Sequence, residues 1–109
     1  YLDTITWSGG NTSLEAIACN LPIVTLPTEF MRGRHTDSFL KMIKVTETIA
    51  KTEEEYLEIA VKLGLNASWR GTIQEKINNH KKSLYDDHSC VQGLEAFYQQ
   101  IAIRKSGEA

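Results

Sequence analysis

A short polar, glycine-rich stretch holds the residues of this chain that are best placed to do chemistry. Gly9 and Gly10 end a β-prone run. The polar residues Asn11, Thr12 and Ser13 follow, at the expected start of a helix. Glycines have no side chain to block a ligand that approaches the backbone. The first turn of a helix has free N–H groups and partial positive charge. The stretch is therefore a candidate site for a diphosphate.

An acid follows these residues one helical turn later. The carboxylate of Glu15 could accept hydrogen bonds from the hydroxyls of a ribose. The same spacing also has a simpler interpretation, because Thr12 and Glu15 form the Thr-x-x-Glu pattern of a capping box. Local chemistry alone leaves two alternatives open, namely a nucleotide pocket and an ordinary turn that caps its own helix.

The elements around this stretch follow the pattern of a parallel sheet. Residues 3–7 are β-prone, residues 12–20 have helical periodicity, and residues 23–26 form a continuous apolar run. Such a run is typical of a strand buried on both faces. Strand, helix and strand then form a βαβ unit. In open α/β sheets ligands bind beyond the carboxyl ends of the strands, where the glycines lie.

The rest of the chain indicates more helix than strand. We expect a helix over residues 35–43 and a last short strand over 46–50. Thr52 is expected to cap the next helix, with Glu55 reaching back to close a capping box. Two further helices are expected over about 68–81 and 87–104.

Together these elements predict an α/β fold, a partial Rossmann-like parallel sheet followed by a helical tail. Residues 1–51 would form a partial Rossmann-like nucleotide-sugar-binding domain. The helices of residues 52–109 would pack on the same domain.

Composition excludes several classes of function. The 109 residues suffice for one domain, and the net charge of −2 argues against a nucleic-acid-binding module. No apolar run approaches the roughly 20 residues that span a membrane. Cys19 and Cys90 lie far apart and are expected to be reduced and partly buried thiols. The three histidines, which resemble no metal-binding set, are His35, His80 and His88. We therefore expect no metal site.

Several motifs occur in the order and with the spacing of one known family. They are Asp3-Thr4, Ser8 to Ala16, Leu21 to Pro27, Arg34, Ser38, Glu47 to Tyr56, Ile59 to Gly64, and Ser83 to Asp86. On these motifs, which extend over nearly the whole chain, the sequence resembles the C-terminal catalytic region of O-GlcNAc transferases. Arg34 matches a family arginine, for which we expect a structural role between its loop and the following helix.

The resemblance implies a fold and a site. The family has a GT-B architecture of two Rossmann-like domains, usually preceded by tetratricopeptide repeats, and its C-terminal domain binds UDP. The segment that matches Gly10, Asn11 and Thr12 holds the diphosphate, and an acid that matches Glu15 holds the ribose. This chain departs from the family at these positions, where His-Thr-Thr is common in place of Gly10 to Thr12 and Asp is frequent in place of Glu15.

The resemblance also implies a function. We expect the donor-nucleotide-binding portion of a cytoplasmic glycosyltransferase that moves N-acetylglucosamine or another hexose from a UDP-sugar to a hydroxyl acceptor, a protein. The donor is a substrate, and no separate cofactor, catalytic residue, nucleic-acid partner or membrane contact is implied. Because the chain starts at Tyr1, we interpret it as a C-terminal piece of a longer enzyme, inactive alone, whose exposed sheet edge could pair with a second copy. The alternatives are a non-catalytic nucleotide-binding module and a protein-interaction module.

Overall fold

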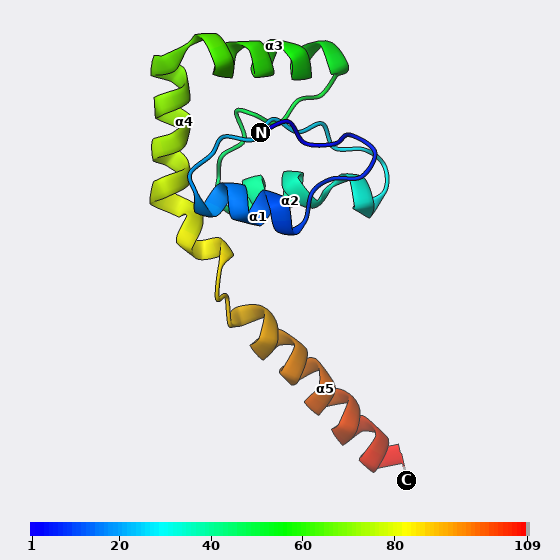
Figure 1. Ribbon diagram of the computed structural model, residues 1–109. Helices are drawn as coiled ribbons and strands as arrows, with labels where there is room; N and C mark the ends of the chain where they lie inside the picture. The colour runs from blue at the N-terminus through cyan, green and yellow to red at the C-terminus, as the bar shows by residue number, and fades with distance from the viewer. Residues whose placement is uncertain (109) are drawn as a thin grey trace.

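A computed structural model describes residues 1–108, and its elements are mainly helical (Figure 1). The molecule is elongated, with extents of 65 × 29 × 18 Å. In chain order the elements are α1 (Asn11–Ala18), the 3-10 helix η1 (Met31–Gly33), α2 (His35–Met42), α3 (Glu53–Leu65), α4 (Ala67–His80), the 3-10 helix η2 (Lys81–Leu84) and α5 (Ser89–Glu108).

The predicted partial Rossmann-like sheet is wrong, because residues 1–108 contain no β-strand. Three extended segments do lie beside one another in parallel, but each pair is joined by a single bridge. Leu2 pairs with Val24, and Thr25 pairs with Ile49. The segments therefore touch at isolated points and do not form a continuous ladder.

Local backbone features explain why no strand develops. Pro22 and Pro27 enclose the apolar run, and a proline cannot donate a ladder hydrogen bond. The predicted third strand is interrupted by a turn, in which the Ile49 N–H donates to the Thr46 carbonyl at 3.2 Å. Residues 5–7 bend away before a second bridge can form. The β propensity of these runs correctly predicted an extended backbone, but it did not predict where the backbone turns.

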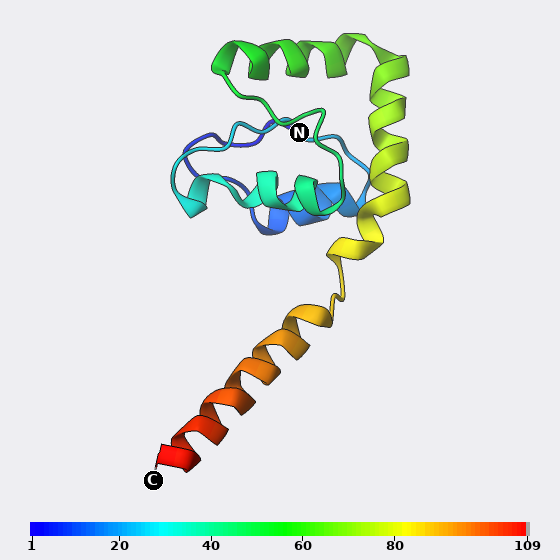
Figure 2. The same ribbon diagram turned by 180° about the vertical axis from the view of Figure 1, so that it is seen from behind.

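The hydrophobic core lies among these segments and four of the helices. In both views the extended segments lie between α3 on one side and α1 and α2 on the other, with α4 beside them (Figures 1 and 2). The fully buried aliphatic side chains come from α1, α4, the end of α2 and the loops. The largest of them are Ile17, Ile23, Val24, Leu40, Ile43, Val45, Ile73 and Ile77.

The helices after residue 51 confirm the predicted starts. Thr52 caps α3 by accepting a hydrogen bond from the Glu55 N–H at 3.1 Å. The Glu55 carboxylate reaches back to the Lys51 N–H at 3.0 Å, one residue earlier than in a standard capping box. Asn66 ends α3 and caps α4 through the Trp69 N–H. As the periodicity predicts, α3 and α4 turn apolar side chains into the core, among them Ile59 and Ile73.

The last helix stands apart from this body. In both views α5 projects away from the other elements (Figures 1 and 2). Among its apolar residues, Val91, Leu94 and Tyr98 are at least half exposed. Within the described residues, no helix combines the length and the apolar character that crossing a bilayer requires.

Candidate functional site

The start of α1 forms the candidate site, and no side chain caps it. The helix begins at Asn11, with Gly10 as the N-cap residue at φ −101° and ψ −89°. Thr12 lies inside the helix, so the alternative in which Thr12 and Glu15 form a capping box is wrong. The N–H groups of the first turn have no intrahelical partner. Because no side chain satisfies them, they remain available to an anion.

Gly10, Asn11 and Thr12 lie at the start of α1, and Glu15 lies about one helical turn further along. Asn11, Thr12 and Glu15 are exposed or half-buried, as is Gly10. Glu15 is four residues after Asn11 and three after Thr12, so all three share one side of the helix. The Thr12 hydroxyl also lies 2.8 Å from the Tyr1 hydroxyl. The structure thus brings the predicted residues together at an open helix terminus.

The two glycines before the helix have different surroundings. A Cβ atom at Gly9 would lie 2.5 Å from the Ser13 hydroxyl and 2.8 Å from the Thr12 hydroxyl. A Cβ atom at Gly10 would meet no other atom within 4 Å. Gly9 is therefore required by packing within the turn, whereas Gly10 faces open space.

Next to the turn formed by Gly9 and Gly10 lies a buried carboxylate whose role the sequence did not indicate. Asp3 is only 3% exposed. Its Oδ1 accepts from the Gly9 N–H at 2.8 Å. Its Oδ2 accepts from the Ser8 hydroxyl at 2.6 Å and the Thr25 hydroxyl at 2.7 Å. The only sequence signal for Asp3 was its place in the family motifs, because its partners are distant in the chain.

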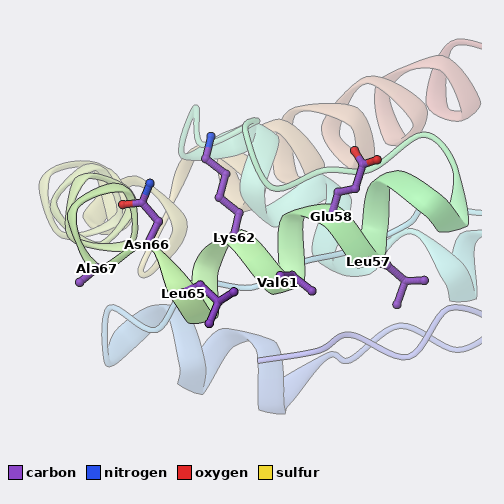
Figure 3. Close-up of a pocket in the computed structure, with 7 residues that line it drawn as sticks. All are labelled: Leu57, Glu58, Val61, Lys62, Leu65, Asn66 and Ala67. Atoms are coloured by element: carbon purple, nitrogen blue, oxygen red, sulfur yellow. The ribbon is translucent and has the colours of Figure 1, made fainter.

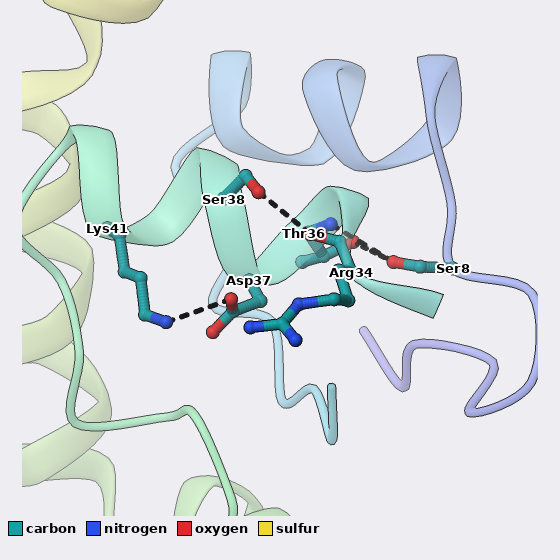
Figure 4. Close-up of polar contacts among 6 residues, drawn as sticks. All are labelled: Ser8, Arg34, Thr36, Asp37, Ser38 and Lys41. Carbon is teal, nitrogen blue, oxygen red and sulfur yellow. Dashed lines mark hydrogen bonds and ion pairs between the residues drawn. The ribbon is translucent and has the colours of Figure 1, made fainter. Parts of the chain in front are cut away.

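A second group of hydroxyls connects the turn to α2. The Thr36 N–H donates to the Ser8 hydroxyl oxygen at 3.0 Å (Figure 4). The Thr36 hydroxyl oxygen lies 2.9 Å from that of Ser8 and 2.8 Å from that of Ser13. Ser8, Ser13 and Thr36 are all buried. We call Asp3, Ser8, Ser13, Thr25 and Thr36 the turn network.

Arg34 ties its loop to α2 through its backbone. It is the N-cap residue of α2, and its carbonyl accepts from both the N–H and the hydroxyl of Ser38. Its side chain is exposed. One turn further on, the buried Asp37 carboxylate pairs with Lys41 at 3.0 Å. Arg34 therefore joins its loop to the following helix through backbone contacts.

An open surface pocket of about 710 Å³ lies elsewhere, along α3 (Figure 3). Exposed apolar side chains dominate its lining, among them Leu57, Val61 and Leu65. The single cation of that lining is Lys62, whose ammonium lies 4.1 Å from the centre of the Trp69 ring. This lining suits a diphosphate poorly in comparison with the free N–H groups of α1.

The histidines are scattered along the chain and form no cluster. His80 Nδ1 lies 2.9 Å from the Lys76 carbonyl at the end of α4. Among residues 1–108, no three side chains of His, Cys, Asp or Glu stand close enough to hold a metal ion. Cys19 and Cys90 are both free thiols, but the predicted partial burial is wrong, because both are exposed at the surface.

Comparison with known proteins identifies relatives. The profile of Glycosyl transferase family 41 matches residues 1–94. A UDP-N-acetylglucosamine–peptide N-acetylglucosaminyltransferase of Caenorhabditis elegans is 36% identical over 76 residues, which are 70% of this chain and 7% of that protein. A probable enzyme of the same name, SPINDLY, from Petunia hybrida is 26% identical over 102 residues, which are 92% of this chain and 11% of that protein.

A solved structure agrees with these matches. A mutant of the Thermobaculum terrenum O-GlcNAc transferase aligns with a TM-score of 0.78 and 34% identity. The alignment covers 91% of this chain and 19% of that chain. The chain thus spans only a small part of the proteins it matches. Because the family profile covers most of its length, the chain belongs to glycosyl transferase family 41.

Proposed function

We propose that this chain is the donor-nucleotide-binding portion of a glycosyltransferase that transfers N-acetylglucosamine from a UDP-sugar to a hydroxyl of a peptide or protein. The observation that carries the proposal is the uncapped start of α1 behind Gly9 and Gly10, at the position where the family holds the donor diphosphate. The names of the relatives support the donor and the acceptor. The two free thiols agree with the cytoplasmic location that forms part of the proposal.

The chemistry follows from the charge that develops during transfer. As the bond between sugar and phosphate breaks, negative charge accumulates on the leaving diphosphate. N–H groups that are free at the start of α1 would stabilise this charge without reorganising, and so would lower the barrier. Asn11 and Thr12 would add side-chain hydrogen bonds. Glu15, on the same side of α1, would accept from the ribose hydroxyls and orient the nucleotide.

Titration of UDP into the chain, followed by calorimetry, tests this proposal. We expect binding by the unsubstituted chain and a loss of about tenfold in affinity for Glu15→Ala, the size expected for a lost hydrogen bond to a charged group. Glu29→Ala is the matched control, because Glu29 is an exposed acid in a loop outside the candidate site. The control should bind UDP like the unsubstituted chain.

The outcomes separate the three classes of function. Absence of UDP binding would contradict nucleotide binding and favour a protein-interaction module. Binding of UDP, without sugar transfer to peptide by the enzyme that carries this segment, would favour a non-catalytic binding module. The proposal would be supported if UDP binds and the sugar is transferred, and if Glu15→Ala reduces that transfer while Glu29→Ala leaves it unchanged.

A further inference from the structure

The turn that presents the candidate phosphate site is held by groups from outside its own helix. Gly9 donates its N–H to Asp3, and the Ser8 N–H donates to the Arg32 carbonyl at 2.7 Å. Ser8 is in turn held by the Thr36 N–H. The turn is therefore fixed largely by residues from other parts of the chain.

Thr36 occupies the centre of these contacts. Its hydroxyl oxygen lies within hydrogen-bond distance of Ser8, which precedes the glycines, and of Ser13, which is inside α1. It also lies 3.4 Å from the Gly9 carbonyl oxygen. One side chain of α2 thus contacts the turn on one side and the first turn of α1 on the other.

We propose that Thr36 is a positioning residue for the donor, acting through its hydroxyl group. By joining Ser8, Gly9 and Ser13, the hydroxyl fixes the direction in which the first N–H groups of α1 point. This inference rests on the proposed function, since it assumes that those N–H groups hold the diphosphate. Thr36 itself is fully buried, so it would act through the turn and not by direct contact with a ligand.

Because these hydroxyl groups are buried, removal of the Thr36 hydroxyl alone should disturb the hydrogen bonds around the turn. Ser13 and Thr36 have no exposed surface, so water cannot replace a hydroxyl that is removed. A buried hydroxyl without a partner is costly, because it loses its hydration and gains no hydrogen bond in exchange. Without the Thr36 hydroxyl, the Ser13 hydroxyl would therefore move toward another hydrogen-bond partner, and the first turn of α1 would move with it.

Two substitutions at this position separate the hydroxyl from simple packing. Thr36→Val keeps the shape and removes the hydroxyl, whereas Thr36→Ser keeps the hydroxyl and removes a methyl group. We expect Thr36→Val to bind UDP about tenfold more weakly, and Thr36→Ser to bind like the unsubstituted chain. The amide NMR signals of Gly9 and Gly10 should move in the valine variant and stay in place in the serine variant.

Ile43→Val provides the stability control, because Ile43 is fully buried at the other end of α2. It should lower stability while leaving UDP affinity unchanged. Equal affinities for the valine and serine variants, or weaker binding by serine than by valine, would overturn the positioning role while leaving the proposed function intact. If the unsubstituted chain does not bind UDP, the proposed function fails first, and this inference fails with it.

Discussion

At the scale of single residues, the adjacent glycines Gly9 and Gly10 differ in the space that surrounds them. A methyl group added at Gly9 would lie less than 3.0 Å from each of the hydroxyls of Ser13, Thr12 and Tyr1. Gly10 faces open space and has a negative φ angle. The pair therefore separates a glycine needed for packing from one that leaves room for a ligand.

Alanine substitutions test this difference. Gly9→Ala should lower the free energy of unfolding by about 1–3 kcal/mol, because the new methyl group must displace hydroxyls that are held in place. Gly10→Ala should lower it by less, at most about 1 kcal/mol, because the new methyl group meets no other atom and only the preference for glycine over alanine at an N-cap is lost. Chemical denaturation of both variants gives the comparison. Equal losses of stability would show that the space beside Gly10 is not open.

Tyr56 connects α3 to the segment that holds Asp3. Its hydroxyl donates to the Asp3 carbonyl at 2.8 Å. Burial raises the pKa of Tyr56 above its ordinary value of 10, and the charges of Asp3 and Tyr1 raise it further. In the unfolded chain the hydroxyl ionises near pH 10, whereas in the folded chain it ionises only at higher pH. The stabilising contribution of Tyr56 is therefore complete below about pH 10 and is lost as the pH rises above it.

Tyr56→Phe should show this dependence. Near neutral pH the variant should be less stable by about 1 kcal/mol, the usual contribution of one hydrogen bond. Above about pH 10 the difference between the two chains should narrow, because only the unsubstituted chain loses the contribution of Tyr56. Burial also raises the pKa of Tyr85, but that group is common to both chains and cancels. A difference that stays constant from about pH 8 to about pH 11 would contradict this account.

At the scale of the elements, helix starts depend on short local patterns. Thr52 lies three residues before Glu55, and its hydroxyl accepts the hydrogen bond from the Glu55 N–H. Thr52→Ala should lower stability by about 1 kcal/mol, the usual cost of losing an N-cap. Thr72→Ala is the matched control, because Thr72 is an exposed threonine in the middle of α4 whose hydroxyl donates to the Ser68 carbonyl. Thermal unfolding should show a clear shift for the first variant and little for the second; similar shifts would rule out the cap.

The difference between local patterns and contacts between distant segments explains what the sequence could predict. The starts of α3 and α4 were predictable because cap and periodicity lie within a few residues of each other. The sheet was not, because extended propensity does not show whether a turn such as that from Thr46 to Ile49 interrupts pairing. The turn network was also out of reach, since Asp3, Thr25 and Thr36 meet only once the chain has folded. The four residues at the start of α1 could be named because they lie close together in the sequence.

At the scale of the whole molecule, the chain consists of a packed body and a projecting helix. The body buries side chains from α1 to α4, such as Ile17 and Ile77. α5 has no buried side chain among the described residues. Tertiary packing, more than intrinsic propensity, stabilises most helices in proteins. The two parts of this chain should therefore differ strongly in their local stability.

Hydrogen–deuterium exchange measures this difference directly. We expect the amides of α5 to exchange many times faster than those of α4 around Ile73 and Ile77, because α5 can unfold without exposing any part of the core. A chain shortened to residues 1–88 should keep the same unfolding midpoint within a few degrees, since it retains every buried aliphatic side chain. Measurement at two chain concentrations supplies the control. Protection of α5 that rises with concentration would show that a second copy covers its apolar residues, and strong protection at both concentrations would contradict the separation of α5 from the body.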